Sequence, residues 1–208
     1  MPDRKDATTF TAAANNALLN ELNWADSRDF ELARRGIGFK FGRQPWPCPV
    51  VPSAILFDLM NGGAKNWPDE PPYRRLGLAA LRAAGPDFDL GNAGAGTGAI
   101  AGAMKGGLGS ASARCGPFTV GALVTVNSVG TCADPTTGAL LARRMAVGVE
   151  MGPAVGRPDP ALGRGKIDLM AEAAATGANT TIAVVATDAR LTKAEALRLA
   201  IMAQDGLA

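Results

Sequence analysis

The sequence predicts a mixed domain of the α/β or α+β class, and three segments carry this prediction. Residues 118–126 and 180–187 are rich in β-branched and apolar side chains, which is typical of buried strands. Residues 192–195 (Thr-Lys-Ala-Glu) form a capping box, and apolar residues at helical spacing follow it. A small-residue loop therefore leads into a buried strand, and the strand leads into a helix that ends near Gly206.

Four other segments complete the expected elements. Residues 10–35 carry alanine and leucine at helical spacing and predict a helix that stops at 36–38 (Gly-Ile-Gly). The short apolar run 54–59 predicts a buried strand, and residues 167–175 predict a short helix. Residues 73–84 predict a helix that ends at Gly85-Pro86. One face of that helix holds small and apolar residues, namely Leu76, Ala79, Ala80 and Ala83.

Composition excludes several classes of function. The chain has 208 residues, which suits one domain over residues 1–208, and 47 % hydrophobic against 19 % charged residues excludes extended disorder. The net charge of +2 gives no strong field toward nucleic acid or a membrane surface. Histidine is absent from the sequence, which excludes histidine triads, histidine metal ligands and histidine pH switches. The remaining chemistry must work without imidazole.

The cysteines and the apolar runs point to a soluble, cytoplasmic protein without a metal or a cofactor. The three cysteines, Cys48, Cys115 and Cys132, are odd in number and widely spaced, which disfavours a disulfide framework and a zinc site. We interpret them as small buried apolar residues in a reducing compartment. The first residues show no secretory signal, and every apolar run is too short for a membrane span.

The glycine-rich segment 91–112 leaves three interpretations open. Its backbone amides could bind a phosphate group, but the sequence contains no P-loop pattern here and does not meet the GxGxxG spacing of dinucleotide-binding loops. Its small residues also allow a strand and a helix to pack closely together. Alternatively, they allow the backbone of this segment to lie directly against a substrate. Lys105 is the only charged residue in this segment.

Two further positions carry candidate chemistry. Thr180 opens a predicted strand directly after Asn179, a place that suits self-cleavage of the Asn179–Thr180 bond and release of an N-terminal threonine. Its α-amine, with an ordinary pKa of about 7.7–8.0, then serves as base for its own hydroxyl. Asn127 ends the strand predicted at 118–126 and is either a turn residue or a donor to an oxyanion.

Five segments together resemble the DmpA-type self-processing aminopeptidases, a family that includes β-peptidyl aminopeptidases, D-esterases and nylon-oligomer hydrolases. The resemblance covers most of residues 36–208, and its segments follow the family's order. They are VVPSAILFDL (50–59), GNAGAGTGA (91–99), MKGGLGSAS (104–112), VGALVTVNSVG (120–130) and the stretch 179–208, which spans the family's self-cleavage site.

The resemblance implies an αββα sandwich like that of the N-terminal-nucleophile hydrolases, here incomplete. It implies cleavage into residues 1–179 and 180–208, with Thr180 as the nucleophile and Asn127 as an oxyanion donor. Phe57 occupies a substrate-pocket position where some members have a tyrosine, and phenylalanine lacks that hydroxyl. Lys105 matches the lysine of the MKGG motif and is a further catalytic candidate. The family also implies a peptide or amide-oligomer substrate and a homo-oligomer.

The chain departs from the family at both ends. The strands that precede the matched region, and the pair of residues that positions the new amine after it, have no counterpart here, so the sequence reads as a truncated member. Two alternatives to hydrolysis follow. The chain is a non-catalytic remnant or assembly piece, which predicts no cleavage, or it is an acyltransferase, which passes the acyl group to an amine instead of water.

Overall fold

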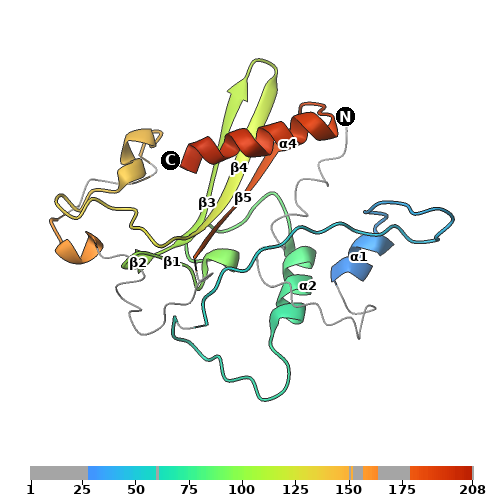
Figure 1. Ribbon diagram of the computed structural model, residues 1–208, viewed down its shortest axis with the longest axis horizontal. Coiled ribbons are helices and arrows are strands. Elements are labelled where there is room, and N and C mark those ends of the chain that lie inside the picture. The colour runs from blue at the N-terminus through green and yellow to red at the C-terminus, as the bar shows by residue number, and fades with distance from the viewer. Residues whose placement is uncertain (1–27, 60, 150, 152–156, 164–178, 208) are drawn as a thin grey trace.

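The computed structural model describes residues 28–59, 61–149, 151, 157–163 and 179–207 of the chain, and they form a mixed α+β arrangement (Figure 1). The helices are α1 (Arg28–Arg34), α2 (Tyr73–Ala83) and α4 (Lys193–Met202). The strands are β1 (Ile100–Ala101), β2 (Met104–Lys105), β3 (Gly107–Cys115), β4 (Phe118–Asn127) and β5 (Thr180–Thr187). Short 3-10 helices are η3 (Gly94–Gly96), η4 (Leu141–Met145), η5 (Pro160–Gly163) and η6 (Ala203–Leu207).

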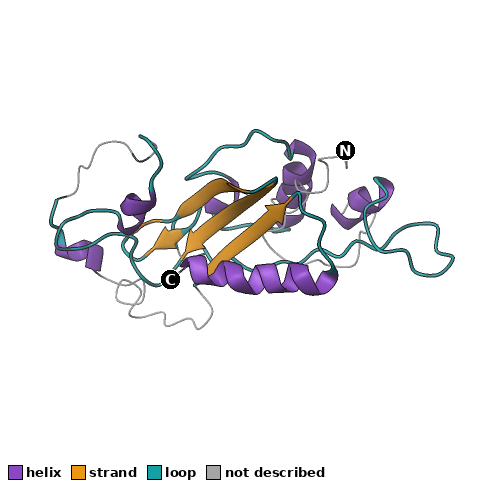
Figure 2. Ribbon diagram, turned by 90° about the horizontal axis from the view of Figure 1, so that it is seen from above, coloured by secondary structure: helices purple, strands orange, loops and turns teal. Residues whose placement is uncertain are grey.

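The centre of the molecule is an antiparallel sheet with the order β3-β4-β5. Strands β3 and β4 form a hairpin whose tight turn follows Cys115, and β5 returns from far along the chain to pair with the other side of β4. Helix α4 runs along one face of this sheet (Figures 1 and 2). Strands β3 and β5 are the edges of this sheet, and such edges are the part of a sheet that is prone to pair with another chain.

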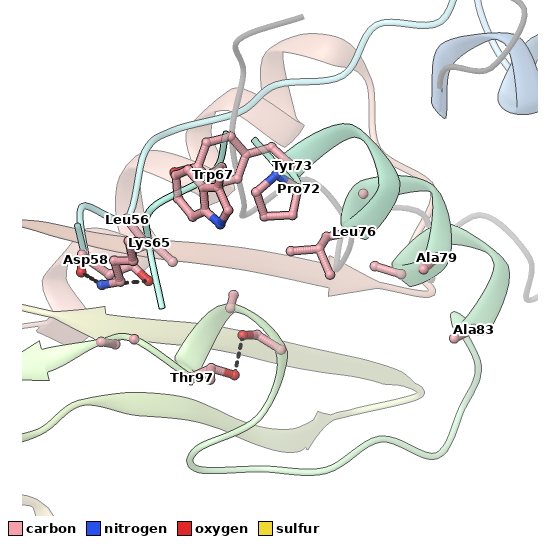
Figure 3. A pocket seen from close by; sticks show the side chains of 16 residues that line it. Leu56, Asp58, Lys65, Trp67, Pro72, Tyr73, Leu76, Ala79, Ala83 and Thr97 are labelled. Carbon is pink, nitrogen blue, oxygen red and sulfur yellow. Dashed lines mark hydrogen bonds and ion pairs between the residues drawn. The ribbon is translucent and has the colours of Figure 1, made fainter. Parts of the chain in front are cut away.

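A small apolar core joins the first two helices away from the sheet. Leu32 of α1 and Leu81 of α2 are almost fully buried against each other, and Ile37 and Val51 pack around them. Leu81 therefore fixes one side of α2 toward α1. The other side of α2 faces the glycine-rich segment that precedes the sheet (Figure 3).

Most elements expected from the sequence are present. The structure contains the helices expected at 73–84 and from 192 onward, and the strands expected at 118–126 and 180–187. It also contains the capping box at Thr192. The strand expected at 54–59 is wrong, because this segment pairs with no strand among the described residues, and its Phe57 carbonyl oxygen instead accepts a hydrogen bond from Asn127 at the end of β4. The helix expected at 10–35 is observed as α1, its remainder lies outside the described residues, and so does the helix expected at 167–175.

Two further expectations concern the cysteines and the membrane. All three cysteines are free and exposed, so the interpretation of them as buried apolar residues is wrong. Among the described residues, we find no helix that is both long enough and apolar enough to cross a bilayer. The αββα layering and the single domain over residues 1–208 stay predictions.

Candidate active site

The structure brings the two principal candidate residues, Asn127 and Thr180, opposite each other. Asn127 is the last residue of β4, Thr180 is the first residue of β5, and the antiparallel register pairs them directly. Side chains of directly opposed residues project from the same face of a sheet, with Cβ atoms about 4.5–5.5 Å apart. The predicted nucleophile and the predicted oxyanion donor therefore lie side by side, although 52 residues separate them in the sequence.

The Asn127 carboxamide is fully buried, with no solvent exposure. Its Nδ2 donates to the carbonyl oxygen of Phe57 at 3.2 Å, and its Oδ1 accepts from the backbone amide of Ile100 at 3.0 Å. Because the oxygen and the nitrogen have different partners, the orientation of the amide is fixed. A fixed orientation of the N–H donors is one requirement of an oxyanion-binding group.

The glycine-rich segment reaches β4 so closely that only glycine fits at Gly106. A Cβ added there would collide with the carbonyl oxygen of Val126 and with Ala99. The Gly106 amide also donates to the Ala99 carbonyl at 2.8 Å, which continues the pairing of β1 and β2 away from their turn. Close packing is therefore the interpretation of this segment that the contacts bear out, and it places the Ile100 amide against Asn127.

Asn179, which precedes the predicted nucleophile, has an unusual environment. Its Oδ1 is buried and makes no hydrogen bond to any described residue. Asn179 lies directly before Thr180, on the acyl side of the predicted cleavage point.

Lys105, the third catalytic candidate, lies on β2 and is exposed. Its Nζ donates to Asn92 Oδ1 at 2.6 Å and to the carbonyl oxygen of Thr97 at 3.3 Å. Both partners belong to the glycine-rich segment. Lys105 thus connects two parts of the glycine-rich segment through hydrogen bonds, and no contact of Lys105 with Asn127 or Thr180 is observed.

A cavity of about 570 Å³ lies between α2 and the glycine-rich segment (Figure 3). One wall is the α2 face that includes Tyr73, Leu76 and Ala80, and the facing wall is residues 94–99. Figure 3 shows Asp58 and Lys65 at one end of the cavity and the α2 side chains at the other. The lining is mainly apolar, and Asp58 and Lys65 are the charged residues in it.

The polar end of the cavity has defined contacts. Lys65 Nζ lies 3.9 Å from Asp58 Oδ2 and also donates to the Asp58 carbonyl oxygen. Tyr73 packs edge-on against Trp67, with ring centroids 5.5 Å apart. Burial, and then the negative charge of Asp58, raise the pKa of Tyr73, so its hydroxyl stays protonated at neutral pH.

The cavity adjoins Asn127 through two short stretches of backbone. Phe57, whose carbonyl oxygen holds the Asn127 amide, lies between the lining residues Leu56 and Asp58. Ile100, whose amide holds the Asn127 oxygen, directly follows the lining residue Ala99. Phe57 thus serves the candidate site through its backbone, a role that its side-chain identity does not reveal.

Several site residues were missed at the level of sequence. Asp58 belongs to the run that was predicted as a buried strand, Lys65 lies in a loop, and Tyr73 begins the predicted helix 73–84. The available signal was the helical stripe at 73, 76, 77 and 80, which is apolar or small but not needed to pack against α1. Within the described parts of the chain, no group of three or more cysteine, aspartate and glutamate side chains is placed to hold a metal ion.

Comparison with known proteins identifies the family. A model of peptidase family S58 matches residues 11–208. The chain belongs to peptidase family S58. Peptidases are hydrolases, so the enzyme class predicted from the sequence is that of the family.

The chain is also similar to mycobacterial proteins named uncharacterized aminopeptidases. It is 40 % identical to one of Mycobacterium bovis over 188 residues, covering 87 % of this chain and 50 % of that protein. The same figures hold for one of Mycobacterium tuberculosis. One of Mycobacterium leprae is 41 % identical over 170 residues, covering 77 % of this chain and 44 % of that protein. The chain thus spans about half the length of the curated relatives it matches.

Proposed function

We propose that the chain is part of a self-processing aminopeptidase or amide hydrolase with an N-terminal threonine nucleophile. The observation that carries the proposal is the pairing of Thr180 with the fully buried, doubly anchored Asn127 at the end of β4. Membership of a peptidase family and the names of its relatives support the class of reaction.

Maturation follows from the position of Thr180. Its Oγ1 attacks the carbonyl carbon of Asn179, the C–N bond breaks, and the nitrogen of Thr180 takes the proton as a free amine. Water then hydrolyses the resulting ester, which leaves a carboxylate on Asn179 and restores the Thr180 hydroxyl.

Turnover uses the same groups. The new α-amine accepts the proton of Oγ1 as the hydroxyl attacks the carbonyl of a peptide or amide substrate. The Asn127 amide, together with backbone N–H groups, stabilises the negative oxygen that forms. The leaving amine takes a proton, and water hydrolyses the acyl-enzyme ester. No step requires histidine, a metal or a cofactor.

Intact mass under denaturing conditions tests the proposal. We expect wild type to give two fragments, residues 1–179 and 180–208, and Thr180→Ala to give one uncut chain. Thr180→Ser keeps a hydroxyl and should still be cut. Thr181→Ala is the matched control, because Thr181 pairs with Val126 and projects from the opposite face of the sheet.

The outcomes separate the alternatives. An uncut wild-type chain would contradict the proposal and favour a non-catalytic remnant. A cut chain that transfers acyl groups to an added amine faster than to water would favour an acyltransferase. Cleavage in both wild type and Thr180→Ala would place the nucleophile elsewhere.

A further inference from the structure

The stretch between α1 and α2 begins with a concentration of positive charge that the chain as a whole lacks. Four arginine and lysine residues and no acidic residue lie between Glu31 and Asp58, whereas the complete sequence has a net charge of only +2. Two of the four, Lys40 and Arg43, belong to residues 38–48, here called the aromatic loop. Neither forms an ion pair with another described residue. The aromatic loop therefore carries positive charge that no described side chain neutralises.

Three aromatic side chains share this loop and are exposed. Phe39 is 62 % exposed, Phe41 is 71 % exposed and Trp46 is 50 % exposed. The rings of Phe39 and Phe41 pack edge-on with centroids 5.7 Å apart, as two residues on the same side of an extended chain can do. Figures 1 and 2 both show the loop projecting outward beyond α1. An exposed apolar cluster with polar surroundings is typical of a surface that binds a protein or a membrane.

Backbone hydrogen bonds hold the aromatic loop in one shape. Phe39 and Cys48 exchange two of them, each 2.8 Å long, which closes the base of the loop. At the tip, the Gln44 amide donates to the Phe41 carbonyl oxygen at 3.1 Å, and Gly42 adopts the positive φ of 53° within this turn. A loop that is already ordered loses little conformational entropy when it binds a partner.

We propose that the aromatic loop docks on an anionic lipid surface, where Phe39 and Phe41 enter the interface and Lys40 and Arg43 meet lipid phosphate groups. A projecting loop can enter a fluid layer, and its positive charge complements the charge of the lipids. The edge-on contact disfavours single-stranded nucleic acid, because one phenylalanine ring covers part of the other ring's face, on which a base would stack. The inference does not depend on the proposed function.

The expected contributions are large enough to measure. A basic residue close to an anionic leaflet strengthens binding about fivefold. A partly exposed phenylalanine that enters the interface adds about 5- to 30-fold. Salt screens the contribution of the charges, so binding should weaken as the ionic strength rises.

Flotation of the full chain with lipid vesicles tests the proposal. The vesicles contain either phosphatidylcholine alone or equal parts of phosphatidylcholine and phosphatidylglycerol. We expect wild type to prefer the anionic vesicles by about 25-fold at low salt, and Lys40→Gln combined with Arg43→Gln to remove most of this preference. Phe39→Ser combined with Phe41→Ser should weaken binding to the anionic vesicles by at least about 25-fold.

A control variant separates this loop from exposed aromatic residues in general. Phe88 is 47 % exposed, but it lies between the acidic residues Asp87 and Asp89, so Phe88→Ser should bind as wild type does. Trp46 stays unchanged in every variant because it contacts Phe30 of α1, with ring centroids 6.3 Å apart. All substituted side chains are exposed, so each variant should keep a melting temperature close to that of wild type.

Each contrary result is specific. If wild type does not bind anionic vesicles, or if the folded double phenylalanine variant binds them as wild type does, the inference is overturned. Binding to a single-stranded oligonucleotide in place of vesicles, lost in the same variants, would overturn it in favour of nucleic acid. Self-association in place of vesicle binding, lost in the double phenylalanine variant, would overturn it in favour of a second copy of the chain.

Intact mass, measured on the same samples, keeps this test apart from that of the proposed function. A chain that cuts itself at the Asn179–Thr180 bond but does not bind vesicles removes the lipid inference and keeps the proposed function. A chain that remains uncut but binds anionic vesicles with the expected variant pattern does the reverse.

Discussion

Replacing Asn127 by aspartate separates its two hydrogen-bonding roles. The aspartate keeps an oxygen that can accept from the Ile100 amide, but it replaces the N–H that donates to the Phe57 carbonyl oxygen. At neutral pH the change also places a carboxylate where the native side chain has no exposure to solvent. A buried charge without a partner costs several kcal/mol after relaxation, so we expect a loss of several kcal/mol in the free energy of unfolding.

Asn127→Ala gives a smaller and pH-independent loss. It leaves the Phe57 oxygen and the Ile100 amide without this partner, and both contacts are only partly buried. At the lower end of the usual cost for each group, the loss is about 2 kcal/mol. In the aspartate variant, burial raises the pKa of the new carboxyl in the folded state. The folded state then binds more protons than the unfolded state, so the stability of this variant should fall as pH rises.

Urea unfolding at pH 5 and pH 8, in the Thr180→Ala background to prevent cleavage, measures both effects. In the self-processing chain, loss of one oxyanion donor should slow turnover about 10²- to 10³-fold in either variant. Thr125→Val is the control, because Thr125 is a buried polar residue on the same face of β4 and has no proposed chemistry. An aspartate variant as stable as wild type at pH 8, with normal processing, would refute the assigned role of Asn127.

Three further predictions concern the cap, the cavity and the lysine. Hydrogen bonds from Thr192, first from its backbone amide, lower the pKa of Glu195 below its ordinary 4.5. The capping box therefore stabilises α4 while Glu195 is ionised, and the melting temperature should fall as the pH drops and Glu195 takes up a proton. Glu195→Gln should make the melting temperature less dependent on pH between about pH 3 and 6. Gly98→Ala should displace the Asp58 side chain, which a Cβ there would overlap, and should lower the melting temperature of the chain. Lys105→Ala should lower thermal stability by about 1 kcal/mol through loss of its contacts to the glycine-rich segment; a loss of processing without any loss of stability would instead assign Lys105 a catalytic role.

The local elements were predictable from the sequence because their signals are local. The capping box at Thr192 is observed with both of its reciprocal hydrogen bonds, and the apolar run of β5 is a strand over the expected residues. Strand β3 was missed because its residues are mostly glycine, alanine and serine, which carry little β-propensity. It forms a strand through its nine-residue register with β4, and this pairing outweighs intrinsic preference.

The candidate site was predictable only in part for the same reason. Asn127 and Thr180 were candidates from their places at the ends of predicted strands, and the family resemblance strengthened them, whereas their direct opposition required the register of β4 and β5. The segment around Phe57 was predicted to be a strand because of its apolar residues. Its observed role depends on a single carbonyl oxygen that meets Asn127 from 70 positions away, and no local pattern encodes that contact.

The absence of histidine gives the proposed mechanism its order of events. A threonine hydroxyl needs a base, and under the proposal that base is the amine of Thr180 itself, which is bound in a peptide until the Asn179–Thr180 bond breaks. Asn127, by contrast, is already buried and oriented in the uncut chain, and the cavity beside it is already open. Under the proposal, the oxyanion donor is therefore oriented before cleavage, whereas the base of the nucleophile is not yet free. Cleavage supplies that base and so acts as the activating step, which ties enzymatic activity to completed folding of the β4–β5 pair.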